Sequence, residues 1–217
     1  IWRIKDEGVN AELHVHDFHT PVDIYPKKGA LAEDVAPNHM EVGSRVSGTL
    51  TLQGKHYTIN GLAFRDHGWG LRNWSTFVSH RWVAGVTTSG TMFLAQTFHS
   101  SDDDLVRFGC LIRDNKLIYA KSVDVLTYLE PDGLTHRGGR LDMTVSTGAV
   151  LRIECTPLQK GVVSWIHGIA CVDTICKFQL GDDEGICDFE FTNNPLRGSH
   201  RPRLAINAVV ENGFNTL

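Results

Sequence analysis

Hydrophobic and polar residues alternate along most of the chain with a period of two. Val46 and Leu50 alternate with small polar residues, and Tyr57 and Ile59 resume the alternation after a turn at residues 53–55. Alternation of this kind is typical of half-buried β-strands, because successive side chains of a strand point to opposite faces. The segment therefore predicts a β-hairpin.

A second hairpin is predicted at residues 82–98, with its turn at Thr88-Ser89-Gly90. No segment keeps apolar residues at helical spacing for more than about two turns. Many short strands separated by turn residues favour an all-β fold, an antiparallel barrel or curved sandwich, and we expect the barrel because closure removes exposed edges. Further strands are predicted at residues 105–112, 117–119, 123–129, 140–145, 150–156, 162–169, 174–180, 186–191 and 204–210.

Two segments interrupt the alternation, residues 20–43 and residues 65–75, and both are interpreted as functional loops. We therefore divide the chain into residues 1–43, the tail of a first β body with its connecting loop, and residues 44–217, the barrel domain. Residues 1–4 already resemble the end of a strand. Either a second copy of the chain, in a homo-oligomer, or a preceding N-terminal segment is expected to complete the first body.

Composition narrows the classes of function. The 217 residues are 41% hydrophobic, enough for a large core, and 21 Lys and Arg against 25 Asp and Glu give a net charge of -4. This balance lacks the basic excess that nucleic-acid binding needs, and no apolar run approaches the ~18 to 20 residues of a membrane span. The five cysteines form no Cys-x-x-Cys pair and mostly lie in apolar runs, which predicts core thiols in a reducing, cytoplasmic compartment.

Residues 61–74 concentrate glycine, tryptophan and charged side chains directly after a predicted strand. Such a mixture can build an apolar pocket with a few polar groups directed inward. If Asp66 is partly desolvated, its protonated form is favoured, and it could act as a general acid with His67 sharing or relaying the proton. The same residues also fit a structural interpretation, in which Arg65 and Asp66 form a buried ion pair and the tryptophans close the end of a barrel.

The order Arg65-Asp66-His67-x-Trp69-Gly70-x-Arg72-x-Trp74 resembles the signature of lipocalin-like proteins related to AttH and to the carotenoid hydratases, or hydroxyneurosporene synthases. Residues 43–61, 80–86 and 185–191 also resemble the corresponding parts of that family, so the resemblance touches most of the chain. It implies two lipocalin-like β bodies with the signature near their junction. This chain would hold the whole second body and only the remnant of the first.

Relatives in that group include hydratases of isoprenoid double bonds and cyclases of polyenes, so the resemblance implies an apolar, terpenoid-like substrate and no cofactor. The enzyme would be a lyase of the hydratase type, an isomerase or a cyclase. Each reaction begins with protonation of carbon in a dry site, and aromatic faces stabilise the resulting cation by ~0.5 to 2 kcal/mol. Asp66 is the predicted proton donor and His67 its partner, and the predicted substrate-binding residues are Arg65, Trp69, Trp74, His80 and Trp82.

Two alternatives belong to other classes of function. A carrier that only binds an apolar ligand in the barrel would need the aromatic walls but no proton donor. A metalloenzyme could use His14 and His16, which share one face of a predicted strand, although no Glu follows at the short spacing of known His-x-His sites; we assign no metal ligand. The surroundings of Asp66 discriminate these readings, since an acid facing an enclosed cavity supports catalysis and one fully paired with Arg65 or Arg72 supports a scaffold.

Overall fold

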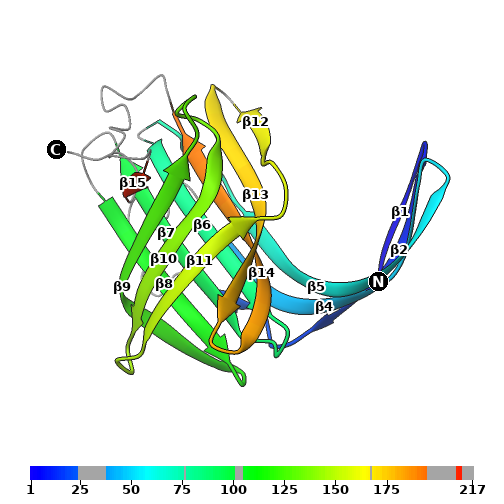
Figure 1. The fold of residues 1–217 in the computed structure, drawn as a ribbon, viewed down its shortest axis with the longest axis horizontal. Coiled ribbons are helices and arrows are strands. Elements are labelled where there is room, and N and C mark those ends of the chain that lie inside the picture. Colours follow the sequence, from blue (N-terminus) through cyan, green and yellow to red (C-terminus); the bar gives the residue numbers. More distant parts are fainter. Residues whose placement is uncertain (24–37, 76, 101–104, 167, 195–208, 212–217) are drawn as a thin grey trace.

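The computed structural model describes residues 1–23, 38–75, 77–100, 105–166, 168–194 and 209–211. Every regular element in these ranges is a β-strand, and the strands form two sheets (Figure 1). The smaller, N-terminal sheet is antiparallel, with β2 and β3 on one side of β4 and β5 on the other. Its strands are β1 (Trp2–Asp6), β2 (Val9–Asp17), β3 (Val22–Asp23), β4 (Asn38–Leu52) and β5 (Lys55–Trp69).

The larger sheet closes into an eight-stranded antiparallel barrel, because its first and last main strands, β10 and β9, also pair with each other. The barrel strands are β6 (Phe77–Thr87), β7 (Met92–Ser100), β8 (Leu105–Arg113), β9 (Lys116–Leu129), β10 (His136–Val145), β11 (Val150–Pro157), β13 (Ile169–Leu180) and β14 (Asp183–Asn193). Two short strands lie outside this ring, β12 (Val162–Ile166) on β13 and β15 (Val209–Glu211) on β9. The predicted all-β, lipocalin-like barrel is confirmed, and the predicted N-terminal β segment forms part of the smaller sheet.

Side chains from the inner faces of the strands fill the barrel. Phe93, Ile153 and Phe189 are fully buried there, and they belong to one apolar cluster that spans the lumen. Close packing of this kind gives most of the stability of a domain, since each large apolar side chain contributes roughly 1.5 to 3 kcal/mol on burial. In the described residues the lumen is a packed core. A pocket for the apolar ligand of the carrier alternative therefore has to lie outside the lumen.

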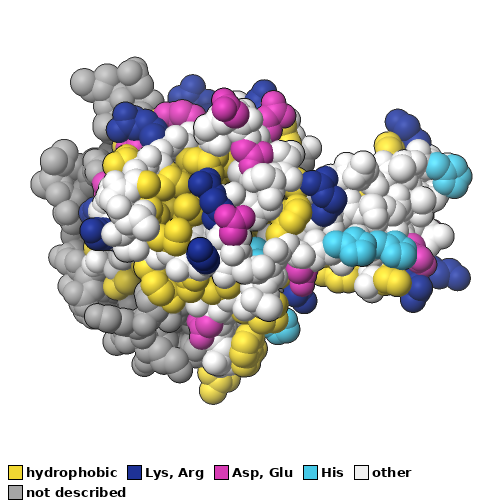
Figure 2. All heavy atoms as spheres, turned by 90° about the horizontal axis from the view of Figure 1, so that it is seen from below, with side chains coloured by type: hydrophobic (Ala, Val, Ile, Leu, Met, Phe, Trp, Pro, Cys, Tyr) yellow, Lys and Arg dark blue, Asp and Glu magenta, His cyan; other side chains and the backbone are white. Residues whose placement is uncertain are grey.

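The N-terminal sheet covers part of the outer face of the barrel. A second apolar cluster is built on Trp82, Leu94 and Cys110 from β6, β7 and β8, and Phe64 of β5 packs on it, with the Phe64 and Trp82 rings 5.8 Å apart. The long strands β4 and β5 then curve away from the barrel and carry β1 and β2 as a projecting arm (Figures 1 and 2). Only one end of β4 and β5 therefore meets the barrel.

Both predicted hairpins are confirmed. The β4–β5 turn places Gln53 and Gly54 at φ values of 47° and 80°, and the β6–β7 turn lies at residues 88–91. The two predicted loops differ from the structure, since β4 begins at Asn38 and β5 continues to Trp69. Charged residues, glycine and tryptophan conceal an alternation that continues in the pairing of β4 with β5, which includes residues 38–43 and 65–69.

The chain changes from the N-terminal sheet to the barrel between Trp69 and Phe77. The domain boundary near residue 44 stays a prediction, because pairing within a sheet does not by itself define a folding unit. Of the strand predicted at residues 204–210, the part before Val209 lies outside the described residues.

Gly138 occupies an irregularity of β10 at the end of the barrel, with a φ of 77°. A Cβ atom there would lie 2.0 Å from the carbonyl oxygen of Cys155. We expect Gly138→Ala to lower the free energy of unfolding by about 2 kcal/mol, measured by urea denaturation. Gly133→Ala is the control, since Gly133 has a φ of 69° and no atom within 4 Å of its added Cβ. It should lose only about 1 kcal/mol, and equal losses in the two variants would contradict the steric argument.

Candidate functional site

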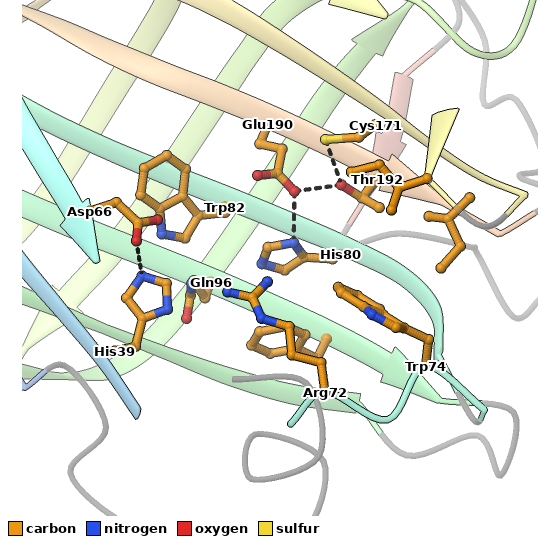
Figure 3. Close-up of a pocket in the computed structure, with 13 residues that line it drawn as sticks. His39, Asp66, Arg72, Trp74, His80, Trp82, Gln96, Cys171, Glu190 and Thr192 are labelled. Carbon is orange, nitrogen blue, oxygen red and sulfur yellow. Dashed lines mark hydrogen bonds and ion pairs between the residues drawn. The ribbon is translucent and has the colours of Figure 1, made fainter. Parts of the chain in front are cut away.

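A pocket of about 160 Å³ lies where the ends of β4 and β5 meet the outer face of the barrel (Figure 3). A dry cavity of about 150 Å³ holds one benzene molecule, so this pocket can enclose one ring or a similar part of a larger ligand. The apolar side chains that line it are Trp74, Trp82, Phe98, Ile166 and Ile169, and the polar and thiol side chains are His39, Asp66, Arg72, His80, Gln96, Cys171, Glu190 and Thr192.

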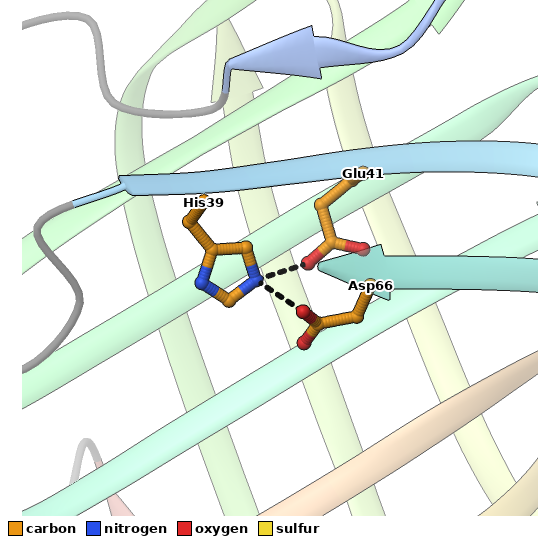
Figure 4. Close-up of side chains that lie close together, drawn as sticks. All are labelled: His39, Glu41 and Asp66. Atoms are coloured by element: carbon orange, nitrogen blue, oxygen red, sulfur yellow. Dashed lines mark hydrogen bonds and ion pairs between the residues drawn. The ribbon is translucent and has the colours of Figure 1, made fainter. Parts of the chain in front are cut away.

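The N-terminal sheet contributes a cluster of three titratable side chains, His39 and Glu41 from β4 and Asp66 from β5 (Figure 4). They meet because Glu41 is the register partner of Asp66 and His39 lies two residues before Glu41, on the same face. His39 Nε2 lies 2.9 Å from Asp66 Oδ1 and 3.1 Å from Glu41 Oε1. Trp82 Nε1 of the barrel donates to Glu41 Oε1 at 3.1 Å and joins the cluster to the second sheet.

The members of this cluster differ in exposure. The side chain of Asp66 is 39% exposed, whereas those of His39 and Glu41 are 7% and 0% exposed. Asp66 also lines the pocket and Glu41 does not. Asp66 is therefore the carboxyl group of the cluster that a bound molecule can reach.

Burial and charge shift the proton affinities of the two buried members. Burial lowers the pKa of His39, but hydrogen bonds to Asp66 and Glu41 and their negative charges outweigh it and raise this pKa to about 9. Burial raises the pKa of Glu41 to about 7, with the charge of Asp66 adding to the effect and the hydrogen bond from His39 opposing it. At neutral pH the cluster therefore holds exchangeable protons directly beside Asp66.

The barrel contributes a second imidazole–carboxylate pair. His80 of β6 lies next to Glu190 and Thr192 of β14, with His80 Nδ1 3.1 Å from Glu190 Oε1 and the Thr192 hydroxyl donating to the same oxygen. Burial raises the pKa of Glu190, but the hydrogen bonds from His80 and Thr192 outweigh burial, and the pKa lies below its usual value. Glu190 is therefore a carboxylate at neutral pH.

Gly68, between His67 and Trp69, makes room for Arg72. A Cβ atom at Gly68 would lie 2.7 Å from Arg72 Nη2, so the arginine side chain lies against the backbone of β5. Its guanidinium carbon is 5.8 Å from the centre of the Trp74 ring. Trp74 in turn meets Phe77 edge to face, with ring centres 5.1 Å apart. Arg72 and Trp74 together form the side of the pocket nearest the start of β6.

The structure brings together four of the predicted site residues, since Asp66, Trp74, His80 and Trp82 all line the pocket. Arg65, His67 and Trp69 do not line it, because β5 alternates and these residues lie on the face opposite Asp66. The functional roles predicted for all of them stay predictions.

The partners of the three remaining residues are also visible. The His67 and Trp69 rings meet edge to face at 5.2 Å. Arg65 Nη2 lies 3.4 Å from Asp17 Oδ2. The Arg65–Asp66 ion pair of the structural interpretation is therefore not formed, and Asp66 is paired with His39 instead.

Sequence reasoning missed several polar residues of the site. His39 and Glu41 could have been found by extending the alternation of β4 back from residue 44. Glu190 meets His80 across 110 positions of sequence, and Gln96 lies on the strand after Trp82, so no local pattern marks either one.

Among the residues that the structure describes, two groups of side chains have donor atoms close enough to share a metal ion, namely His39, Glu41 and Asp66, and Cys171, Asp173 and Glu190. In the first group a metal would have to replace the hydrogen bonds that His39 Nε2 makes to both carboxyl groups. His14 and His16 belong to neither group. His14 Nε2 lies 3.3 Å from Glu12 Oε1, and Leu13 and Val15 point to the opposite face of β2, as predicted.

Comparison with known proteins identifies a family and a fold. The profile of a family described as a domain of unknown function (DUF7064) matches residues 1–195. No curated protein matches the sequence significantly. Two solved structures are similar: an AttH-type protein from Nitrosomonas europaea, with a TM-score of 0.62 and 16% identity, and kievitone hydratase from Nectria haematococca, with a TM-score of 0.56 and 10% identity.

The match covers 88% of this chain for the first protein and 90% for the second, and 64% of the length of each of them. At these identities the likeness concerns the fold, and it confirms the predicted resemblance to the lipocalin-like AttH and hydratase proteins. In the described part of the chain, no helix has the length and apolarity needed to cross a membrane.

Proposed function

The chain belongs to the DUF7064 family, whose profile covers residues 1–195, and from this premise we propose that it is an enzyme that protonates a carbon–carbon double bond of a hydrophobic small molecule. Three outcomes follow from the same first step: addition of water, movement of the double bond, or ring closure. The fold that the chain shares with kievitone hydratase supports the first of them, hydration.

The observation that carries this proposal is the setting of Asp66. Its carboxyl group faces an aromatic pocket, is partly exposed there, and is held by a buried imidazole rather than by an arginine. In the structural interpretation, an ion pair with arginine would keep the acid out of the pocket. A carrier that only binds a ligand would not need the buried His39 and Glu41 behind Asp66. Perturbed proton affinities beside a cavity are typical of acid–base sites.

In the proposed mechanism Asp66 transfers a proton to one carbon of the double bond. The positive charge then develops on the neighbouring carbon, close to the faces of Trp82 and Trp74, where cation–π attraction contributes about 0.5 to 2 kcal/mol. His39 and Glu41 hold the protons that restore Asp66 after transfer. The cation is consumed by attack of water, by attack of a hydroxyl group of the substrate, or by loss of a neighbouring proton.

The pocket also supports a class of substrate. Its volume of about 160 Å³ encloses one ring or one isoprenoid unit, and its aromatic and aliphatic side chains suit an apolar group. A terpenoid-like molecule, or an aromatic ring bearing an isoprenoid side chain, would therefore place its double bond beside Asp66.

A single probe tests this proposal. We choose 2-(3-methylbut-2-enyl)phenol, which has one ring, one isoprenoid double bond and one hydroxyl group. In D2O the protein should place one deuterium on the former CH carbon of the double bond, detected by mass spectrometry in the tertiary alcohol, the dimethylchroman or the shifted alkene. If the probe binds, as measured by quenching of tryptophan fluorescence, and takes up no deuterium, the protein is a carrier.

A further inference from the structure

His80 has one ring nitrogen whose hydrogen-bonding capacity is unused in the described structure. Its Nδ1 is bonded to Glu190, and its Nε2 is buried without a partner. Because Glu190 is a carboxylate and can only accept, the hydrogen of a neutral His80 lies on Nδ1. Nε2 then carries a lone pair, on a side chain that lines the pocket.

Gln96 supplies a second unused acceptor in the same place. Its side-chain oxygen is buried without a partner in the described structure, and the residue is only 1% exposed. Gln96 lies diagonally across from His80 on the outer face of the sheet, because its register partner is Trp82 and that of His80 is Phe98. Both residues line the pocket (Figure 3).

Two unpaired acceptors at one pocket indicate what binds between them. A buried polar atom without a hydrogen bond costs roughly 1 to 3 kcal/mol, so a molecule that donates to both atoms is favoured there. Water has two hydrogens to donate, and buried waters typically make about three hydrogen bonds. The arrangement of His80 and Gln96 therefore suits one bound water molecule.

The ring of His80 is also held in one orientation. It stacks on Phe98 with ring centres 4.3 Å apart and an angle of 10° between the planes, and Phe77 meets its edge at 6.3 Å. Thr192 fixes the oxygen of Glu190 that accepts from Nδ1. Pre-organisation of this kind is typical of groups that take part in proton transfer.

From these observations we infer that His80 is the catalytic base that activates water in the pocket, with Glu190 and Thr192 as positioning residues and Gln96 as the second contact of the water. This inference rests on the proposed function and selects hydration among its three outcomes.

Asp66 gives one proton to the double bond, the water oxygen forms a bond to the cationic carbon, and His80 Nε2 takes the proton that this water releases. The product is the alcohol. His39 and Glu41 restore the proton of Asp66, and the resting state returns when the proton on His80 passes through solvent to this cluster.

The test separates protonation from water addition. With 2-(3-methylbut-2-enyl)phenol in D2O and in H2¹⁸O, His80→Gln should retain deuterium uptake within about threefold and lose about 100-fold in ¹⁸O-labelled alcohol, in the range of a general base. The chroman and the shifted alkene then become the main products. An equal loss of both labels, or an unchanged yield of alcohol, would overturn the inference. Failure of the proposed function is a different result, the absence of deuterium uptake in the wild-type protein.

A second measurement needs no substrate. In protein labelled with ¹⁵N-histidine, the signal of the neutral His80 ring, assigned by its loss in His80→Gln, should show hydrogen on Nδ1 and none on Nε2. Glu190→Gln should remove this preference. His56→Gln, at an exposed position of the β4–β5 hairpin, is the matched control and should change neither the signal nor the products. A hydrogen on Nε2 in the wild-type protein would refute the assignment of His80 as a base.

Discussion

Replacing Asp66 with asparagine is expected to reduce deuterium uptake into the probe by about 10² to 10⁴-fold, the range of a general acid. The amide keeps the shape of the carboxyl group and can accept from His39 Nε2 through its oxygen, but it has no acidic proton to give to carbon. The loss should therefore appear in kcat rather than in KM. Circular dichroism and the urea midpoint should show that Asp66→Asn is folded.

Asp124→Asn is the matched control for this experiment. Asp124 is an Asp at a partly exposed position of the barrel, where it pairs with Arg107 at 2.6 Å. Its replacement should leave turnover within about twofold, since an exposed ion pair contributes only ~0 to 1 kcal/mol. Full deuterium uptake in folded Asp66→Asn would exclude Asp66 as the acid.

The stability of the protein should decrease as pH rises from about 6.5 to about 9 because of His39. Its pKa is raised from 6.5 in the unfolded chain to about 9 in the folded protein. A raised pKa means that the folded protein binds the proton more tightly, so the stabilisation is complete below pH 6.5 and is lost as pH passes through 9. The difference corresponds to a free energy on the order of 3 kcal/mol.

Urea denaturation at a series of pH values measures this effect, with His39→Gln as the comparison. The difference in free energy of unfolding between the wild-type protein and this variant should be largest below pH 6.5 and should shrink toward pH 9. Glu41 acts with the same sign in a lower window, between its usual value of 4.5 and about 7. A difference that stays constant with pH would show that His39 contributes through packing alone.

The sequence predicted the strands well because alternation reports directly on half-buried faces. It could not predict which face of a strand turns into the barrel. Both faces of β6 are buried, since the lumen covers one and the N-terminal sheet the other, so Val83 and Trp82 look equally like core residues. For this reason the sequence predicts a carrier's ligand inside the barrel, whereas the pocket lies on the outer face of the barrel.

The candidate site shows the same limit. Asp66 and His67 are neighbours in sequence, which suggested a proton-sharing pair, but neighbours on a strand point in opposite directions. The partner of Asp66 is instead His39, which lies across the β4–β5 pairing. Residues such as Trp74, His80 and Trp82 follow β5 closely in sequence and could be predicted, whereas Glu190 reaches the site only when β14 pairs with β6.

Two groups of titratable side chains at the pocket belong to different sheets, the cluster of Asp66 to the N-terminal sheet and the His80–Glu190 pair to the barrel. They can therefore diverge separately among related chains. A slip of one residue along β5, about 3.3 Å, would present His67 in place of Asp66 and leave the barrel wall unchanged. Under the proposed function, relatives that differ only at this end of β5 would still bind an apolar ligand but would lose the proton transfer. One scaffold would then give both enzymes and proteins that only bind.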